Sequence, residues 1–382
     1  MKRQFRNKMN ILNFKQEGIN LLESVDIKVD GTRPWDIKIL SDKTYSRVFR
    51  DGTLGFGEAY LNGEWECQSL DQLMEKIIRG NLHEKVNRNI KFLLYVFLAK
   101  FINYGRKDKA FEVGQHHYDI GNDFFAQMLD KRMVYTCGYW KNAKNLDEAQ
   151  EAKLDLVCRK VGLKPGMKVL DIGGGWGSFA KFAAEKYGVS VVNITVSKEQ
   201  VELANKLCKG LSVENRLQDY RDVNGEPYDR IVSLGMFEHV GYKNYRTFMQ
   251  VIQKNLKEEG LFLLHTIGHN YTTTFVDPWI RRYIFPNAML PSMKQISESV
   301  ENLFVIEDWH NFGDDYDKTL MAWLDNFERN WPKLKDKYGK RFYRVWRYWL
   351  MTSACTFRLR NCQLWQIVLS KHGITGGYRS IR

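Results

Sequence analysis

The sequence of 382 residues predicts an α/β protein in which a small, mostly helical domain precedes a mostly parallel, seven-stranded sheet. Short apolar strands alternate with amphipathic helices from Val169 onward, and this alternation is typical of a parallel sheet covered by helices. A glycine-rich turn follows the first of these strands. The first hundred residues contain turns and short amphipathic segments without that alternation, which indicates a separate domain.

The first predicted domain comprises residues 1–105. The apolar segment Ile90–Tyr104 predicts a helix that docks this domain onto the rest, and the charged run Arg106–Lys109 predicts a linker. We therefore divide the chain into a domain of residues 1–105 and a domain of residues 106–382.

The second domain begins with the strand at Val169 and continues in a regular order. The expected elements are helix 177–187, strand 190–195, helix 198–208, strand 212–217, strand 229–234, helix 243–256 and strand 260–266. Strands near 303–308 and 363–370 complete the sheet. Segments 270–300 and 310–350 are expected to form a helical lid.

The segment Val169–Gly177, with the sequence VLDIGGGWG, predicts a binding site for a nucleotide-like cofactor. Glycines at 173, 175 and 177 permit a sharp turn from strand to helix and let the backbone approach a ligand closely. Strand 190–195 lacks the acidic residue that usually binds the ribose of NAD. This favours S-adenosylmethionine over a dinucleotide, and a tight turn without a ligand is the remaining interpretation.

The net charge of +13 is concentrated at the C-terminal end, where residues 331–382 contain twelve Lys or Arg and one acid. An apolar stripe at helical spacing predicts an amphipathic helix, formed by Phe342, Val345, Trp346, Trp349 and Leu350, with Arg341, Arg344 and Arg347 off the stripe. Such a helix suits an anionic membrane surface. It equally suits a helix packed on a core with a solvated basic face, and nucleic acid is a third partner for the charge.

Cellular location follows from the cysteines and the apolar segments. The six cysteines show no paired spacing, so we expect free thiols and no metal site. The longest apolar run, Phe92–Ala99, is too short to cross a bilayer, and no secretory leader is recognisable. We therefore expect a cytoplasmic protein.

Polar residues that follow the predicted strands are the candidates for chemistry, because ligands of such sheets bind beyond the carboxyl ends of the strands. Glu238 and His239 follow strand 229–234, and His265 lies at the end of strand 260–266. A single histidine at a strand end is more often structural, whereas convergence on one rim favours a site. Two aromatic segments, Gln115–Phe124 and Tyr135–Trp140, either cover a sulfonium cofactor through cation–π attraction or simply pack.

These segments resemble the cyclopropane fatty acid synthase (cyclopropane-fatty-acyl-phospholipid synthase) family. The resemblance covers residues 110–370, and Leu54–Glu58 resembles the extra N-terminal domain of the longer bacterial members. The motifs that carry it are His117–Phe125, Tyr135–Trp140, Val169–Gly177, Thr195–Gln200, Met236–Gly241, His265–Gly268, Tyr283–Asn287 and Asp308–Gly313.

The resemblance implies a class I S-adenosylmethionine-dependent methyltransferase fold and a reaction on cis-unsaturated acyl chains of membrane phospholipids. Methyl transfer to an alkene carbon would give a carbocation, and loss of a proton from the new methyl group to a bound bicarbonate would close a cyclopropane ring. The bicarbonate would be held by Cys137, Glu238, His265, the backbone of Ile267, and Tyr316. The cofactor would be held by Tyr135, Thr136, Asp171, Gly173, Gly175, Gly177, Thr195 and Gln200.

Charge repulsion constrains how these residues would hold the anion. We expect Glu238 to accept the bicarbonate O–H while His265 and Tyr316 donate hydrogen bonds. The chain departs from the family at Gly174, where members commonly have cysteine. It also departs near the C-terminus, where Ser353 aligns with a cysteine of some members, so Cys355 is not expected to be catalytic.

Other functions remain open at this level. A related methyltransferase could form a methyl-branched lipid or methylate a small molecule. The charge suggests a nucleic acid methyltransferase or binder, and an empty cofactor turn would leave a catalytically silent lipid-surface protein. We expect the domain of residues 106–382 to be catalytic and the domain of residues 1–105 to contact lipid or to arrange a homodimer. The expected partners are the phospholipids of an anionic bilayer, with which the protein associates peripherally on the inner face of the membrane. Nucleic acid is not expected as a partner.

Overall fold

The computed structural model describes residues 14–86 and 120–382, with the exception of Asn287. The chain divides into two compact units. The first unit contains Met1–Ile102, Phe275–Pro286 and Glu328–Arg360, and the second contains Asn103–Thr274, Asn287–Phe327 and Asn361–Arg382. The first unit thus includes two later segments of the chain in addition to the N-terminal one.

Several expectations lie outside the described residues. These are the helix Ile90–Tyr104, the linker Arg106–Lys109, the boundary between residues 105 and 106, and the first part of the aromatic segment Gln115–Phe124. They stay predictions.

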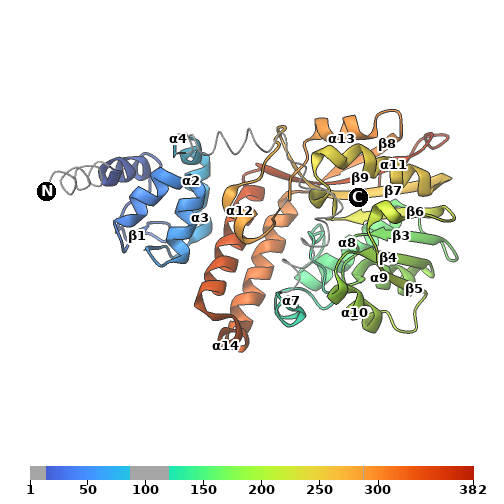
Figure 1. Ribbon diagram of the computed structural model, residues 1–382, viewed down its shortest axis with the longest axis horizontal. Helices are drawn as coiled ribbons and strands as arrows, with labels where there is room; N and C mark the ends of the chain where they lie inside the picture. Colours follow the sequence, from blue (N-terminus) through green and yellow to red (C-terminus); the bar gives the residue numbers. More distant parts are fainter. Residues whose placement is uncertain (1–13, 87–119, 287) are drawn as a thin grey trace. The chain divides into compact units, whose positions relative to one another are not determined.

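The second unit contains a seven-stranded sheet in the order β5-β4-β3-β6-β7-β9-β8 (Figure 1). Strand β9 is antiparallel to its neighbours β7 and β8, and the other neighbouring pairs are parallel. This confirms the predicted mostly parallel sheet. The strands are β3 (Lys168–Ile172), β4 (Ser190–Thr195), β5 (Val213–Leu217), β6 (Tyr228–Leu234), β7 (Leu256–His269), β8 (Val305–Asn311) and β9 (Cys362–Ser370).

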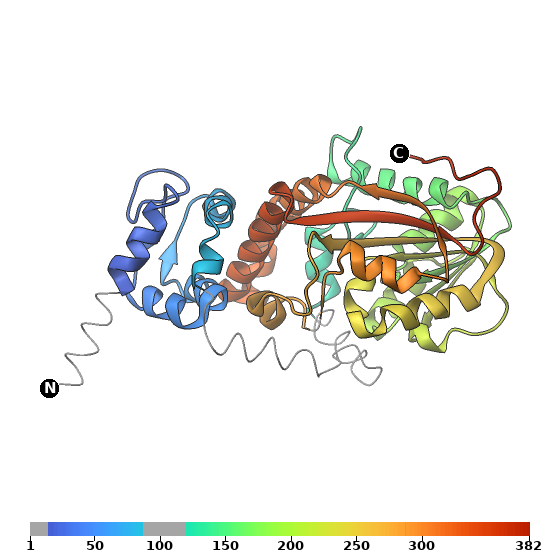
Figure 2. The same cartoon turned by 90° about the horizontal axis from the view of Figure 1, so that it is seen from above.

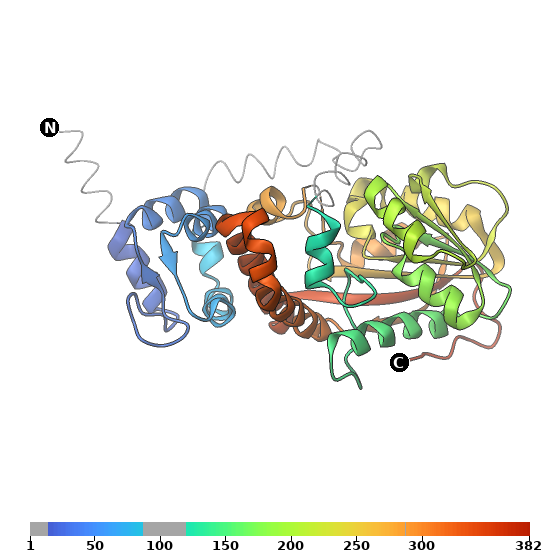
Figure 3. The ribbon, with the colours of Figure 1, turned by 90° about the horizontal axis from the view of Figure 1, so that it is seen from below.

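Helices cover both faces of this sheet (Figures 2 and 3). Alternate residues of β3 point to opposite faces, so Val169 joins an apolar cluster with Leu154 and Phe179, whereas Leu170 joins one with Phe248. The helices and 3₁₀ turns of this unit are α7 (Asn122–Met128), α8 (Leu146–Lys160), α9 (Ser178–Tyr187), α10 (Lys198–Leu207), η1 (Tyr220–Asp222), η2 (Phe237–His239), η3 (Tyr242–Asn244), α11 (Tyr245–Asn255) and α13 (Met293–Val300).

The two segments expected to form a helical lid contain helices. Residues 270–300 contain two short ones, α12 (Pro278–Tyr283) and α13. Residues 310 and 311 end β8, and residues 314–350 belong to α14 (Asp314–Arg358), which reverses direction at Gly339, where φ is 73° (Figure 1). Glycine tolerates this left-handed conformation at no steric cost.

The first unit is mostly helical. It contains a helix over residues 14–23, a two-stranded sheet, α12 and the later part of α14. Gly57 is needed for close packing, because a Cβ there would lie 2.3 Å from a ring carbon of Trp279. The N-terminal elements are β1 (Lys38–Ile39), α2 (Lys43–Leu61), β2 (Trp65–Glu66), α3 (Leu70–Arg79) and α4 (Leu82–Val86).

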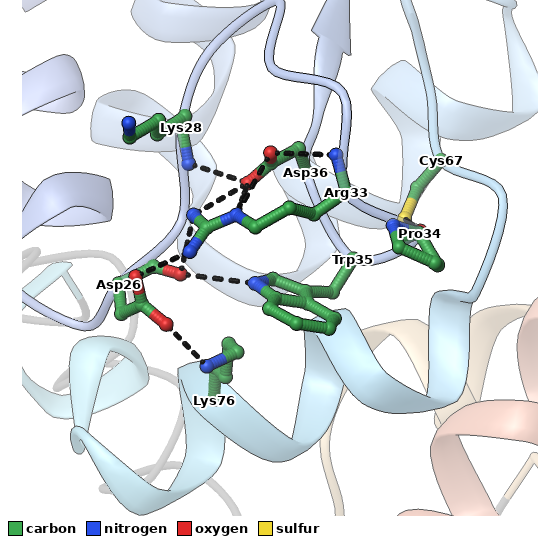
Figure 4. A network of polar contacts seen from close by, with 8 residues as sticks. All are labelled: Asp26, Lys28, Arg33, Pro34, Trp35, Asp36, Cys67 and Lys76. Atoms are coloured by element: carbon green, nitrogen blue, oxygen red, sulfur yellow. Dashed lines mark hydrogen bonds and ion pairs between the residues drawn. The ribbon is translucent and has the colours of Figure 1, made fainter.

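A polar network ties the start of this unit to α3 (Figure 4). The guanidinium of Arg33 lies 2.6 Å from the carboxylate of Asp26 and 2.9 Å from that of Asp36. Lys76 also contacts Asp26, at 2.8 Å, and both cations flank the ring of Trp35 at 5.0 and 4.8 Å. Hydrogen bonds from Arg33 hold the pKa of the Asp36 carboxyl well below its usual range.

The basic, tryptophan-rich helix of the C-terminal end packs within the first unit. Trp346, Trp349 and Leu350 are buried, in agreement with the core-packing alternative. The position expected for Arg344, on a solvated face, is wrong. Its side chain is buried and donates hydrogen bonds to the carbonyl of Tyr60 and to the carboxylate of Glu66, each at 2.6 Å.

Candidate active site

The glycine-rich turn joins β3 to α9 at the carboxyl end of the sheet. Gly173, Gly175 and Gly177 have φ values of 77°, 58° and 77°, which L side chains rarely adopt. A Cβ at Gly173 would also lie 2.5 Å from Cγ of Met236. The turn therefore depends on glycine both for its conformation and for its closeness to the residue that follows β6.

Buried oxygen atoms without hydrogen-bond partners line this turn. Both carboxylate oxygens of Asp171 and the side-chain oxygen of Asn193 have none. The two residues are opposite each other in the β3–β4 register. Burial raises the pKa of Asp171 to about 7, and the charge of Lys153 opposes that shift. Buried polar atoms without partners are rare, so they favour a ligand that donates hydrogen bonds here.

The departure from the family at Gly174 has a structural reason. A Cβ at this position would lie 2.1 Å from an oxygen of Asp171 and 2.2 Å from the side-chain oxygen of Asn193. These oxygens fill the space that a cysteine side chain would need. In this chain, therefore, glycine at 174 leaves room for the side chains of Asp171 and Asn193.

The end of β4 brings Thr195 and Gln200 together. The hydroxyl of Thr195 donates a hydrogen bond to the amide oxygen of Gln200 at 2.7 Å. Gln200 lies in the first turn of α10, which Ser197 caps by accepting a hydrogen bond from its backbone N–H. The amide nitrogen of Gln200 is 3.5 Å from the position of a Cβ on Gly175. The predicted cofactor-binding residues at the end of β3 therefore lie next to those at the end of β4.

Side chains of α8 contact Thr136, and Trp323 of α14 contacts Tyr135. Lys153 of α8 is fully buried and donates to the Thr136 hydroxyl at 2.7 Å, and Gln150 donates to its carbonyl at 2.7 Å. The ring of Tyr135 lies 5.3 Å from that of Trp323. Burial lowers the pKa of Lys153 to about 8. The sequence reasoning missed Lys153, although a charge four residues after Ala149 on the buried stripe of α8 was a usable signal.

Glu238 and His265 lie together at the rim of β6 and β7. His265 is opposite the last residue of β6 in the register, and η2 carries Glu238 just beyond that strand. The backbone N–H of Ile267 donates to one carboxylate oxygen of Glu238 at 2.7 Å, and the other oxygen is buried without a partner. The Nε2 atom of His265 is likewise buried without a partner. Ile267 thus uses its N–H to hold Glu238.

Burial controls the protonation of these two groups. It raises the pKa of Glu238 to about 7, while hydrogen bonds from the backbone oppose the shift. It lowers the pKa of His265 well below its ordinary value, with help from the charges of Lys153 and Lys160. His265 is therefore a neutral imidazole at neutral pH, and Glu238 titrates there.

Cys137 forms a second cluster with Thr319 of α14, the helix that also carries Tyr316. Cys137 is fully buried, and its sulfur lies 3.7 Å from the hydroxyl of Thr319. That hydroxyl also accepts hydrogen bonds from the backbone N–H of Gly138 and the indole N–H of Trp140. Tyr316 precedes Thr319 by three residues, so both are on one face of the helix. Burial raises the pKa of Cys137 well above its ordinary value, which keeps it a thiol.

Phe312 connects the two clusters. Its ring lies 6.0 Å from His265 and 5.3 Å from Tyr139, two residues after Cys137. His239 is buried with a pKa lowered to about 4, and Cys355 is a buried thiol of the first unit. Within the described parts of the chain, no group of three or more His, Cys, Asp or Glu could hold a metal ion.

The strand order, the glycine turn and the polar rim define a protein with the class I S-adenosylmethionine-dependent methyltransferase fold. The family model of mycolic acid cyclopropane synthetase matches residues 105–367. The chain belongs to this family, and it is an S-adenosylmethionine-dependent transferase. The resemblance inferred from its motifs is thereby confirmed.

Individual relatives agree with this assignment. The chain is 50% identical over 362 residues to the cyclopropane-fatty-acyl-phospholipid synthase of Escherichia coli (strain K12), which covers 95% of this chain and 94% of that protein. The structure of the cyclopropane synthase MmaA2 from Mycobacterium tuberculosis superposes with a TM-score of 0.64 at 32% identity, covering 68% of this chain and 98% of that one. The mycolic acid cyclopropane synthase CmaA1 complexed with SAH and CTAB gives the same values.

Proposed function

We propose that the chain is a cyclopropane-fatty-acyl-phospholipid synthase, which adds a methylene group from S-adenosylmethionine across a cis double bond of a phospholipid acyl chain with bicarbonate as the base. The observation that carries the proposal is the pair of buried, unpartnered atoms at one strand rim, Oε2 of Glu238 and Nε2 of His265. The sequence identity of 50% with the synthase of Escherichia coli, over 95% of the chain, supports the choice of substrate.

The residues around the glycine turn fit the cofactor. When bound, S-adenosylmethionine supplies an electrophilic methyl group. The unpartnered oxygens of Asp171 and Asn193 can accept hydrogen bonds from a ligand, and the backbone at Gly173 can approach it closely. Tyr135, in a cluster with Trp323, offers an aromatic face to a sulfonium. The CmaA1 structure complexed with SAH supports this assignment.

The rim residues fit a hydrogen-bonding anion. When bound, bicarbonate supplies the base. Glu238 can accept the O–H of such an anion through Oε2, because Ile267 already occupies Oε1. A carboxylate would otherwise repel the anion, and the pKa of about 7 shows how strongly this site disfavours a charged Glu238. His265 would donate a hydrogen bond to the anion on the side opposite Glu238, and Cys137 remains a neutral thiol.

A lipid assay tests the proposal. Purified protein is incubated with S-adenosylmethionine and vesicles of monounsaturated anionic phospholipid, with and without bicarbonate, and the acyl chains are analysed by mass spectrometry and NMR. We expect a gain of one methylene, loss of the alkene signal, and stimulation by bicarbonate. A branched chain that keeps its alkene would contradict ring formation, and turnover indifferent to bicarbonate would contradict the base.

Glu238→Gln sharpens this test. We expect it to retain S-adenosylmethionine binding, measured by calorimetry, and to lower ring formation about 100-fold or more, as losses of groups that manage a proton do. Glu259→Gln, at an exposed position of β7, is the matched control and keeps full turnover. Unchanged turnover in Glu238→Gln would remove this residue from the anion site.

We further propose that the protein works at the anionic inner face of the cytoplasmic membrane as a peripheral protein. Among the helices that the structure describes, none is long and apolar enough to cross a membrane. The net charge of +13 supports attraction to anionic lipid.

A further inference from the structure

A row of polar side chains crosses three neighbouring strands behind His265. In the sheet register His265 of β7 is opposite Gln366 of β9, and Gln366 is opposite His310 of β8. Residues opposite each other on neighbouring strands project from the same face of the sheet. His265 and Gln366 are fully buried, and His310 is 8% exposed. The sequence reasoning assigned no role to Gln366 or His310.

The hydrogen bond within this row involves the ring nitrogen of His265 that faces away from its unpartnered atom. The amide nitrogen of Gln366 lies 3.3 Å from Nδ1 of His265. An amide nitrogen can only donate, so Nδ1 is the acceptor and carries no proton. A neutral imidazole has one proton, and this proton must then be on Nε2, the buried atom without a protein partner.

Lys160 lies next to His310, at the far end of the row. The ammonium group of Lys160 is buried and lies 3.0 Å from Nδ1 of His310. Burial lowers the pKa of Lys160 to about 7, and in its protonated form Lys160 donates to Nδ1 of His310. Burial is the main cause of the lowered pKa of both histidines, and the charge of Lys160, which is 3.9 Å from Asp308, adds to it. A second proton on His265 is thereby disfavoured.

We propose that Gln366 is a positioning residue that holds His265 in the form protonated at Nε2, so that His265 donates a hydrogen bond to a ligand oxygen at the strand rim. This inference rests on the proposed function for the identity of that ligand, the bicarbonate oxygen. The opposite tautomer would present a lone pair to the anion and repel it. The family resemblance identified His265, and the register of β7 with β9 adds the residue that sets its proton.

The first test needs no substrate. Full-length protein labelled with ¹⁵N-histidine is examined by long-range ¹H–¹⁵N NMR at neutral pH, and the signals of His265 among the eight histidines are assigned by comparison with His265→Gln. We expect a protonated Nε2 and an unprotonated Nδ1. A protonated Nδ1 would mean that the Gln366 amide accepts instead, and would overturn the proposal.

Variants of Gln366 test the consequence for binding. Gln366→Leu removes the donor, and we expect the KM for bicarbonate to rise about tenfold or more, a size typical of lost supporting hydrogen bonds, with a smaller change in kcat. Gln366→Glu replaces the donor by an acceptor, so the proton should move to Nδ1 in the NMR spectrum. Unchanged tautomer and unchanged KM in both variants would refute the role of Gln366.

Gln363→Leu is the matched control. Gln363 lies three residues earlier on β9, therefore on the opposite face, and hydrogen bonds to Asn270 and Asn311. It should leave the His265 spectrum and the bicarbonate KM unchanged. If the wild-type enzyme shows no dependence on bicarbonate, the proposed function loses its base, whereas the NMR experiment still decides the role of Gln366 independently.

Discussion

At the scale of single residues, burial rather than neighbouring charge controls the candidate catalytic groups. Desolvation is the largest cause of the raised pKa values of Glu238, Asp171 and Cys137 and of the lowered pKa of His265. A charged form without water must find another partner, and these groups have few within the protein. The site therefore holds mostly neutral donors and acceptors until a charged ligand enters it.

The raised pKa of Glu238 predicts a pH-dependent stability. Its value in the folded protein is about 7 against an ordinary 4.5, so its stabilising contribution is complete below about 4.5 and is lost as pH rises through 7. Glu238→Gln cannot ionise. Relative to wild type, we expect this variant to gain on the order of 3 kcal/mol of unfolding free energy between pH 4.5 and 8, measured by urea denaturation.

Glu259→Gln serves again as the control for removal of a carboxylate, here from an exposed position of β7. A difference between Glu238→Gln and wild type that is constant over this pH range would show that Glu238 ionises freely in the folded state.

At the scale of elements, α14 shows how one helix serves two purposes. Its first turns carry Tyr316 and Thr319 to the candidate site, and beyond Gly339 the returning arm packs within the first unit. Arg347 of that arm contacts Glu328 of the outgoing arm at 3.1 Å. The basic character of the helix therefore has a structural use, because its arginines bind carbonyls and carboxylates of the protein itself.

Arg344 provides a test of this packing. Its guanidinium lies 3.9 Å from the ring centroid of Tyr60 and donates to the carbonyls of Tyr60 and Trp65. Arg344→Met would leave these acceptors without a donor, and we expect a loss of about 2 kcal/mol or more in unfolding free energy, measured by denaturant titration. The exposed Arg341→Met should change it by less than about 0.5 kcal/mol. Equal effects would contradict a structural role for Arg344.

At the scale of the whole molecule, the charge of +13 is the property most relevant to a membrane. Trp346 and Trp349 are buried in the first unit, and Arg344 and Arg347 form ion pairs with Glu66 and Glu328. In the proposed association with a membrane, attraction to lipid would therefore come from other, exposed lysines and arginines. It should act through long-range electrostatics rather than through insertion of this helix.

This leads to a prediction for vesicle binding. In sedimentation assays we expect the protein to bind vesicles rich in anionic phospholipid and to bind phosphatidylcholine vesicles weakly. Raising the salt concentration from about 0.05 to 0.5 M should release most of the protein, because the screening length falls below about 5 Å. Binding that persists at high salt would indicate insertion of apolar groups and would contradict the electrostatic account.

Much of the fold was accessible from the sequence. Strand 190–195 was predicted with the bounds that β4 has, and helix 198–208 differs from α10 by one residue, because alternation and capping residues are local signals. The glycine turn and the rim positions of Glu238 and His265 follow from the same pattern. The roles of Cys137 and Tyr316, by contrast, came from the family resemblance, since nothing in their local sequence indicates an anion site.

The sequence by itself determined which residues form strands and helices, which face of each element is apolar, and which polar residues follow the strands. Only the tertiary structure decided what covers each face. Arg344 is buried because Tyr60 and Glu66, far away in the chain, provide its partners. Gln366 acquires a role because register places it opposite His265. The physical reason is that the spacing of apolar residues along an element depends only on the local sequence. Which segment packs against its apolar or polar face depends on residues that are distant in the chain.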